Sequence, residues 1–188
     1  MLLETDYTQQ KPEHASFAPR LAALLLDFAI LGIPLIALNF YNIIELRSAV
    51  LHVLIFIIGL SYKPFTEYKY HGTPGKLIMK LEVVDNNYDY IDLQKSFLRS
   101  LILLIPRFLS LITYVLAFSN PESVNVEGYF AFATWVASEY KILTIISSII
   151  SYLSIADIIV YLVNINGNQR SLKDVIADTY VVEKIKDH

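Results

Sequence analysis

LAALLLDFAILGIPLIALNF, residues 21–40, contains a single charged side chain, Asp27. A helix needs about 20 mainly apolar residues to cross the roughly 30 Å hydrocarbon core of a bilayer. Three further apolar segments follow at residues 49–65, 97–118 and 142–163. The sequence therefore predicts an all-α transmembrane fold, a four-helix membrane bundle formed by one domain that covers residues 1–188.

The composition favours a membrane protein and excludes several other classes. Hydrophobic residues make up 55% of the chain, which is high for a soluble domain. No basic stripe is present, so nucleic acid is not an expected partner. Cysteine is absent and the histidines have no metal-ligand spacing, so we expect no metal site and no cofactor. These histidines are His14, His52, His71 and His188.

Lysine and arginine are distributed unevenly among the polar segments, and cytoplasmic loops retain an excess of these residues. The loop at 66–96 and the C-terminal tail at 164–188 are rich in them. The loop at 119–141 carries Glu122, Glu127 and Glu139 and no basic residue before Lys141. We therefore expect 119–141 to be extracytoplasmic and both termini to be cytoplasmic. The N-terminal tail, 1–18, is acidic and unlike a secretory signal, so the first helix should stay in the membrane.

The cytoplasmic loop contains an alternating pattern that is typical of strands. KLIMKLEVVD (76–85) and YDYIDL (88–93) flank Asn86 and Asn87, and asparagine tolerates the positive φ of a tight turn. We expect a small β-hairpin here. Residues 179–182 could add a third strand, because an isolated two-stranded hairpin is only marginally stable.

The extracytoplasmic loop is aromatic. Its central part, VEGYFAFATWVASEY (126–140), has Trp135 near the middle. Aromatic residues accumulate at the level of lipid headgroups, which favours an amphipathic element lying there. A re-entrant segment or a partner-binding loop fits the same pattern.

Four blocks of the chain, in this order and spacing, resemble the RDD family of small bacterial membrane proteins. They are PRLAALLLDFAI (19–30), HGTPGKLIMKLEVVD (71–85), FLRSLILLIPR (97–107) and QRSLKDVIADTYVVEK (169–184). The resemblance implies that Arg20 and Asp27 are the first two residues of the family motif. The third is Asp174 by preference, with Asp157 as the alternative. It also implies a place in the bacterial cytoplasmic membrane and a proposed role in transport, since some members are described as sodium/proton antiporters.

Ionisable residues at membrane depth cost about 2.5 to 3.5 kcal/mol each to insert, so they are paired or face a cavity. Helical spacing places Asp27, Arg107 and Asp157 at a similar depth. We expect Arg107 to pair with one or both carboxylates. This layer is either a proton or cation relay, with oxygens from Ser61, Tyr62, Ser154 or Asn164, or polar contacts that hold the helices together.

The block Gly72-Thr73-Pro74-Gly75-Lys76 is not a nucleotide-binding loop, because it follows a membrane helix and lacks the P-loop spacing. We expect a tight turn in which Gly75 adopts the left-handed conformation. Lys76 and Lys80 should then face anionic headgroups.

Two functions follow from these patterns. The first is exchange of a small monovalent cation for a proton by an oligomeric transporter. The alternative is a non-transporting membrane scaffold, assembly factor or regulatory subunit that binds a protein partner. Membrane lipids are expected partners in either case. We do not expect an enzyme, because no nucleophile and base are placed together.

Overall fold

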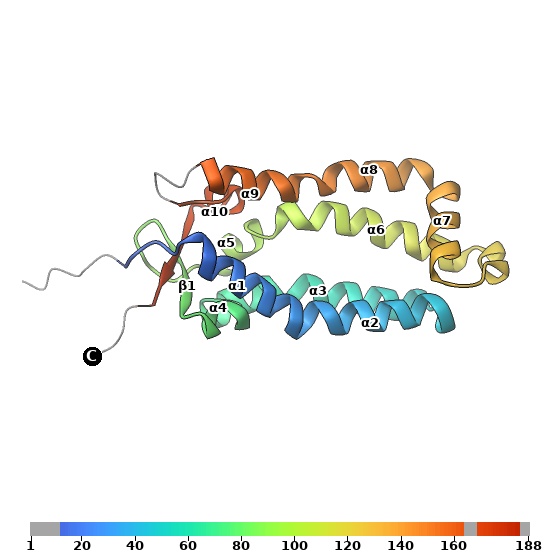
Figure 1. Cartoon of the computed structure of the whole chain (residues 1–188), viewed down its shortest axis with the longest axis horizontal. Coiled ribbons are helices and arrows are strands. Elements are labelled where there is room, and N and C mark those ends of the chain that lie inside the picture. Colours follow the sequence, from blue (N-terminus) through green and yellow to red (C-terminus); the bar gives the residue numbers. More distant parts are fainter. Residues whose placement is uncertain (1–11, 164–168, 185–188) are drawn as a thin grey trace, which may run out of the picture.

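The computed structural model describes residues 12–163 and 169–184, and it is mostly helical with one small sheet (Figure 1). Three helical runs are long and apolar enough to cross a membrane: Phe17–Leu46, Ala49–Tyr70 and Lys141–Val163. The third predicted segment, 97–118, contains α6 (Leu101–Ser119), whose apolar part, Leu104–Ser119, is shorter. Three of the four predicted spanning helices are therefore present at full length.

The first run is continuous but changes its winding. It comprises α1 (Phe17–Asp27), the π-turn η1 (Phe28–Gly32), α2 (Ile33–Tyr41) and the π-turn η2 (Asn42–Leu46). The η1 turn directly follows Asp27 and precedes Pro34, which cannot donate a backbone hydrogen bond. The helix is thus locally widened next to Asp27.

The second helix, α3 (Ala49–Tyr70), is longer than predicted. Its end was expected at residue 65, next to Pro64, but Pro64 is buried inside the helix. The Thr66 hydroxyl donates to the carbonyl of Tyr62 (2.7 Å) and supports the turn that the proline weakens. The helix ends at His71, which has a φ of 64°. This extension brings Glu67, previously placed in a loop, onto a helix face.

The remaining predicted segments are interrupted. The segment that was expected to begin at 97 is split between α5 (Leu93–Leu98) and α6, with the break at Arg99 and Ser100. The run near the C-terminus comprises α8 (Lys141–Ser151) and α9 (Leu153–Val163). At the end opposite the sheet, η3 (Pro121–Asn125) and α7 (Tyr129–Glu139) join α6 to α8, and α7 runs across the long helices (Figure 1).

The sheet pairs strands that are far apart in the sequence. β1 (Leu81–Asp85) is antiparallel to β2 (Thr179–Glu183), with Val83 opposite Val181. The predicted strand at 179–182 is thus confirmed, whereas the predicted hairpin is wrong. Its first part forms the short helix α4 (Pro74–Ile78), and its second strand is reduced to one bridge between Val84 and Tyr90.

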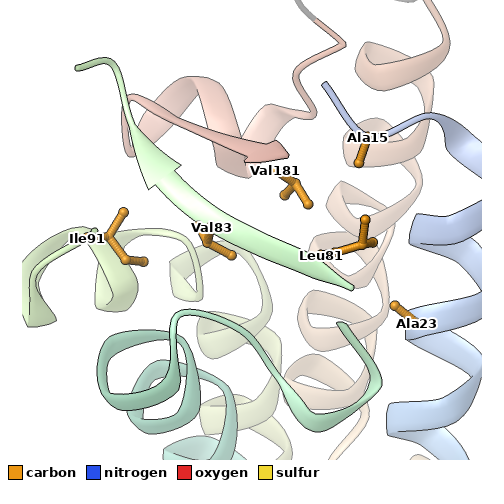
Figure 2. Close-up of a cluster of buried hydrophobic side chains, with 6 residues drawn as sticks. All are labelled: Ala15, Ala23, Leu81, Val83, Ile91 and Val181. Carbon is orange, nitrogen blue, oxygen red and sulfur yellow. The ribbon is translucent and has the colours of Figure 1, made fainter. Parts of the chain in front are cut away.

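The hairpin fails because aspartates redirect the chain. The Asp85 carboxylate accepts the amides of Asn87 and Asp89, which closes the turn, and Asp92 caps α5. The other strand neighbour comes from the N-terminal segment, where the Ala15 amide donates to the Val181 carbonyl (2.9 Å). A buried apolar cluster lies between the sheet and the helices, as Figure 2 shows: Ala15, Ala23, Leu81, Val83, Ile91 and Val181.

The short helix α10 (Leu172–Ile176) precedes β2 and packs on α9. It completes the sheet end of the molecule, which contains α4, α5, α10, the two strands and the described part of the N-terminal tail (Figure 1). The opposite end is formed by η2, η3 and α7. Between these ends run only the long apolar helices.

Candidate functional site

Ionisable side chains from distant parts of the sequence meet at the sheet end. We call them the charge network: Arg20 of α1, Glu67 of α3, Lys76 of α4, Arg99 of the α5–α6 junction and Asp174 of α10. Positive and negative groups alternate along it, so each carboxylate has two cationic neighbours. The network therefore ties together elements that share no other ionic contact among the described residues.

Arg99 is the centre of the network, and its side chain is fully buried. Its Nε donates to Glu67 Oε2 (2.8 Å), and its Nη1 forms an ion pair with Asp174 Oδ1 (2.8 Å). The Thr179 hydroxyl of β2 also accepts from Nη1. A guanidinium suits this role because its fork of donors can satisfy several acceptors at once and it stays charged when buried.

Arg20 extends the network to the first helix. Its Nη1 donates to Asp174 Oδ2 (2.8 Å), and its other nitrogens donate to the carbonyls of Ala15 and Val181 (3.1 and 3.3 Å). The guanidinium also lies over the Tyr161 ring of α9, 4.9 Å from its centroid. The preferred motif aspartate, Asp174, is thus the one that the structure places against Arg20.

Asp174 and Lys76 lie outside the long helices, and both are strongly influenced by burial. Burial alone would raise the pKa of the Asp174 carboxyl, but Arg99 and Arg20 outweigh it and hold the pKa well below its ordinary value. Burial lowers the pKa of Lys76, although Glu67 opposes this change. The expectation that Lys76 faces lipid headgroups is wrong, because its Nζ is paired with Glu67 Oε1 (2.6 Å).

Asp27 occupies a separate place, which we call the Asp27 niche. Its Oδ1 accepts from the Tyr62 hydroxyl (2.9 Å) and from the Gly75 amide (2.8 Å), and its Oδ2 accepts from the Thr73 hydroxyl (2.5 Å). All three donors are neutral. Among the described residues, no lysine, arginine or histidine forms an ion pair with this carboxylate.

Gly75 is required by close packing, and the prediction of a left-handed conformation is wrong. The residue with positive φ is His71, while Thr73 caps α4 and Pro74 occupies its first turn. A Cβ at Gly75 would lie 2.1 Å from the Ala23 carbonyl oxygen and 2.9 Å from the Asp27 carboxylate. The glycine thus lets α4 press directly onto α1, and its amide reaches Asp27 for the same reason.

The predicted layer of Asp27, Arg107 and Asp157 is not formed by direct contacts. Arg107 Nη1 donates to the Gly59 carbonyl of α3 (3.2 Å). Asp157 accepts the Lys173 amide (2.9 Å) and pairs with the Lys173 ammonium. Similar depth was the only argument for the layer, and residues at one depth can point to different neighbours around the bundle.

Glu67 and Arg99 were not identified as site residues from the sequence. Glu67 was missed because α3 was expected to stop at residue 65. Arg99 was missed because it was counted only among the basic residues that mark the cytoplasmic side. A signal was available: Lys63 and Glu67 stand four residues apart, which on a continuing helix places both on one face. Of the other predicted oxygen donors, the structure describes neither Asn164 nor the side chain of Ser154.

Comparison with known proteins gives one family. The model of the RDD family matches residues 14–178, a span that includes the charge network and the Asp27 niche. No curated protein and no solved structure matches the chain significantly.

Proposed function

Because the chain belongs to the RDD family, we propose that it is a multi-pass protein of the bacterial cytoplasmic membrane that crosses the bilayer four times. In this topology α6 is the third crossing, both termini are cytoplasmic and α7 lies outside. The support is the asymmetry of charge: basic residues gather at the sheet end, and 119–140 has none.

We propose further that the protein exchanges a small monovalent cation for a proton at Asp27. The observation that carries this proposal is that Asp27 is bonded only to neutral donors. A carboxylate of this kind can take up a proton or a cation without breaking an ion pair. Asp157, Glu67 and Asp174, by contrast, already have cationic partners that such an event would displace.

The chemistry of the niche suits the exchange. Hard cations prefer carboxylate and hydroxyl oxygens, and Asp27, Tyr62 and Thr73 present both. When a cation binds, the protonated carboxyl releases one proton and the two hydroxyls turn their lone pairs toward the cation. When a proton returns, the cation leaves. The local widening of the helix at η1 lies directly beside this position.

The test is cation-driven proton movement in proteoliposomes, with equal amounts of wild type, Asp27→Asn and Asp157→Asn protein. Asp27→Asn should abolish exchange of sodium, lithium or potassium for protons, whereas Asp157→Asn should retain it. Glu45→Gln is the matched control, because Glu45 is an exposed carboxylate on the same helical run.

Absence of flux above empty liposomes in wild type overturns the proposal, as does wild-type flux from Asp27→Asn. The first result, together with a loss of thermal stability in Asp27→Asn, favours the non-transporting membrane subunit. We propose an oligomer for the transporter, since four helices enclose little space, and the oligomeric state of the reconstituted protein tests this separately.

A further inference from the structure

Lys63 is a partly buried cation at the sheet end that has no carboxylate of its own among the described residues. It lies on the same face of α3 as Glu67, but Glu67 is already paired with Lys76 and Arg99. Among the described residues, no carboxylate forms an ion pair with Lys63. Its Nζ donates only to the Arg99 carbonyl, at a long 3.5 Å.

The surroundings of Lys63 are positive. Among the neighbouring charges, Glu67 acts most strongly on its ammonium, and the three cations Lys173, Arg99 and Lys76 oppose Glu67. One nitrogen of the fully buried Arg99 guanidinium, Nη2, also has no hydrogen-bond partner. A partly buried cation beside other cations is stabilised when an anion compensates its charge.

A helix N-terminus adds to this positive potential. The long helix α6 begins at Leu101, directly after the carbonyl that Lys63 contacts. The Ser100 hydroxyl does not cap α6, because it donates to the Ser96 carbonyl (3.3 Å). Helix N-termini attract anions through their free amides and the helix dipole.

The depth of this place indicates the kind of anion. Lys63 lies beside the start of α6, where the polar α5 junction changes into an apolar helix. Basic residues at such a boundary are expected at the level of the lipid headgroups. Basic pockets between membrane helices on this side of a bilayer bind phosphate-bearing headgroups. We propose that Lys63, with the N-terminus of α6, binds a phosphate group, supplied by an anionic phospholipid.

The site is independent of exchange at Asp27, and binding rather than transport tests it. Native mass spectrometry of the full chain in detergent counts bound phosphatidylglycerol during a titration, with phosphatidylcholine as the zwitterionic reference. Lys63→Gln should weaken the first phosphatidylglycerol by about five-fold, the factor expected for one lysine near anionic lipid. Lys63→Arg should bind as wild type does.

Lys69→Gln is the matched control. Lys69 is on the same helix and exposed, over the rings of Phe65 and Tyr70, so its loss should leave the first phosphatidylglycerol unchanged. A second measurement separates a lipid headgroup from free inorganic phosphate as the source of the phosphate group. It compares thermal unfolding in lipid-free detergent between sodium phosphate and sodium chloride of equal ionic strength. A Lys63-dependent gain in inorganic phosphate shows that a free phosphate suffices, and a gain with phosphatidylglycerol alone assigns the site to lipid.

The Tm of Lys63→Gln in phosphatidylcholine shows whether the variant is correctly folded. Removal of an uncompensated cation should leave the Tm of Lys63→Gln unchanged or higher there, while wild type gains more than the variant from phosphatidylglycerol. The proposal is overturned if Lys63→Gln binds phosphatidylglycerol as tightly as wild type, if Lys69→Gln weakens it equally, or if Lys63→Gln is strongly destabilised in both lipids.

Discussion

The two ends of the molecule fasten the same apolar helices in different ways. At the sheet end, the five charged groups of the charge network are paired with one another, and three of them, Glu67, Arg99 and Asp174, are fully buried. At the α7 end, aromatic rings pack around Phe132, which is fully buried against Phe118 and Trp135. Arg47, which is partly buried there, donates to the Val126 carbonyl and lies over the Phe132 ring, 5.2 Å from its centroid.

This difference predicts different weaknesses. Ion pairs are directional and depend on each partner and on pH, whereas an aromatic cluster depends on the volume and shape of its rings. Removal of one charge at the sheet end should therefore lower the free energy of unfolding, and removal of one ring should do so at the α7 end. The following substitutions measure that contrast.

The largest effect is expected for Asp174→Asn at the sheet end. The change leaves Arg20 and Arg99 without their shared carboxylate, and breaking a buried pair costs about 3–5 kcal/mol. Denaturant unfolding in detergent, followed by circular dichroism, measures the loss. Asp178→Asn is the control, because Asp178 is exposed and pairs with Arg170 alone, so it should change little. Equal stability of the two variants would contradict the network.

Phe132→Ala tests the α7 end. Removal of a fully buried ring should cost about 3 kcal/mol, because the surrounding rings cannot close the space. The single tryptophan, Trp135, contacts this ring and reports the change by fluorescence. Phe130→Ala, at an 83% exposed position of the same helix, should be nearly neutral. If both variants lose the same stability, the cluster is not what holds this end.

Gly75→Ala should have an intermediate effect of about 2 kcal/mol, from overpacking. The added methyl group would meet the Ala23 carbonyl at 2.1 Å, so α4 must move away from α1. Gly59→Ala is the control, since its nearest atom, Leu35 Cδ1, is at an ordinary 3.4 Å. Thermal unfolding of the two variants compares them, and a neutral Gly75→Ala would show that α4 is not pressed onto α1.

The smallest effect concerns the partly exposed pair of Asp85 and Lys95. Burial alone would raise the pKa of Asp85, but hydrogen bonds from Lys95 and two backbone amides lower it. A lowered carboxyl pKa means that the stabilisation is present above the unfolded pKa of about 4 and is lost as pH falls through the folded value. Asp85→Asn should therefore cost about 1 kcal/mol at pH 7. The difference from wild type should shrink as the pH falls below about 4, and a difference that does not shrink in acid would contradict this assignment.

The sequence predicts what apolar patterning controls. The apolar segments at 21–40, 49–65 and 142–163 form helices of spanning length, and 179–182 forms a strand. The family was also identified correctly from motif blocks. These features depend on residues that are close in the sequence, so they can be predicted from one sequence.

The pairing of charges could not be predicted because it depends on which way a helix is rotated. Arg99 meets Glu67 only because α3 continues past Pro64 and α5 breaks before α6. The alternation in YDYIDL predicts a strand, yet the carboxylate of Asp85 closes the preceding turn before that strand can pair. In both cases a tertiary or side-chain contact prevails over the local pattern.

The pair of Arg20 and Asp174 can form only late in synthesis of the protein, because 154 residues separate its partners. Synthesis proceeds from the N-terminus, so Arg20 reaches the membrane long before Asp174 leaves the ribosome. Glu67 and Arg99 find each other earlier, and the last segment then joins both arginines. A chain that stops before α10 therefore lacks the carboxylate that pairs with Arg20, while Arg99 keeps only Glu67.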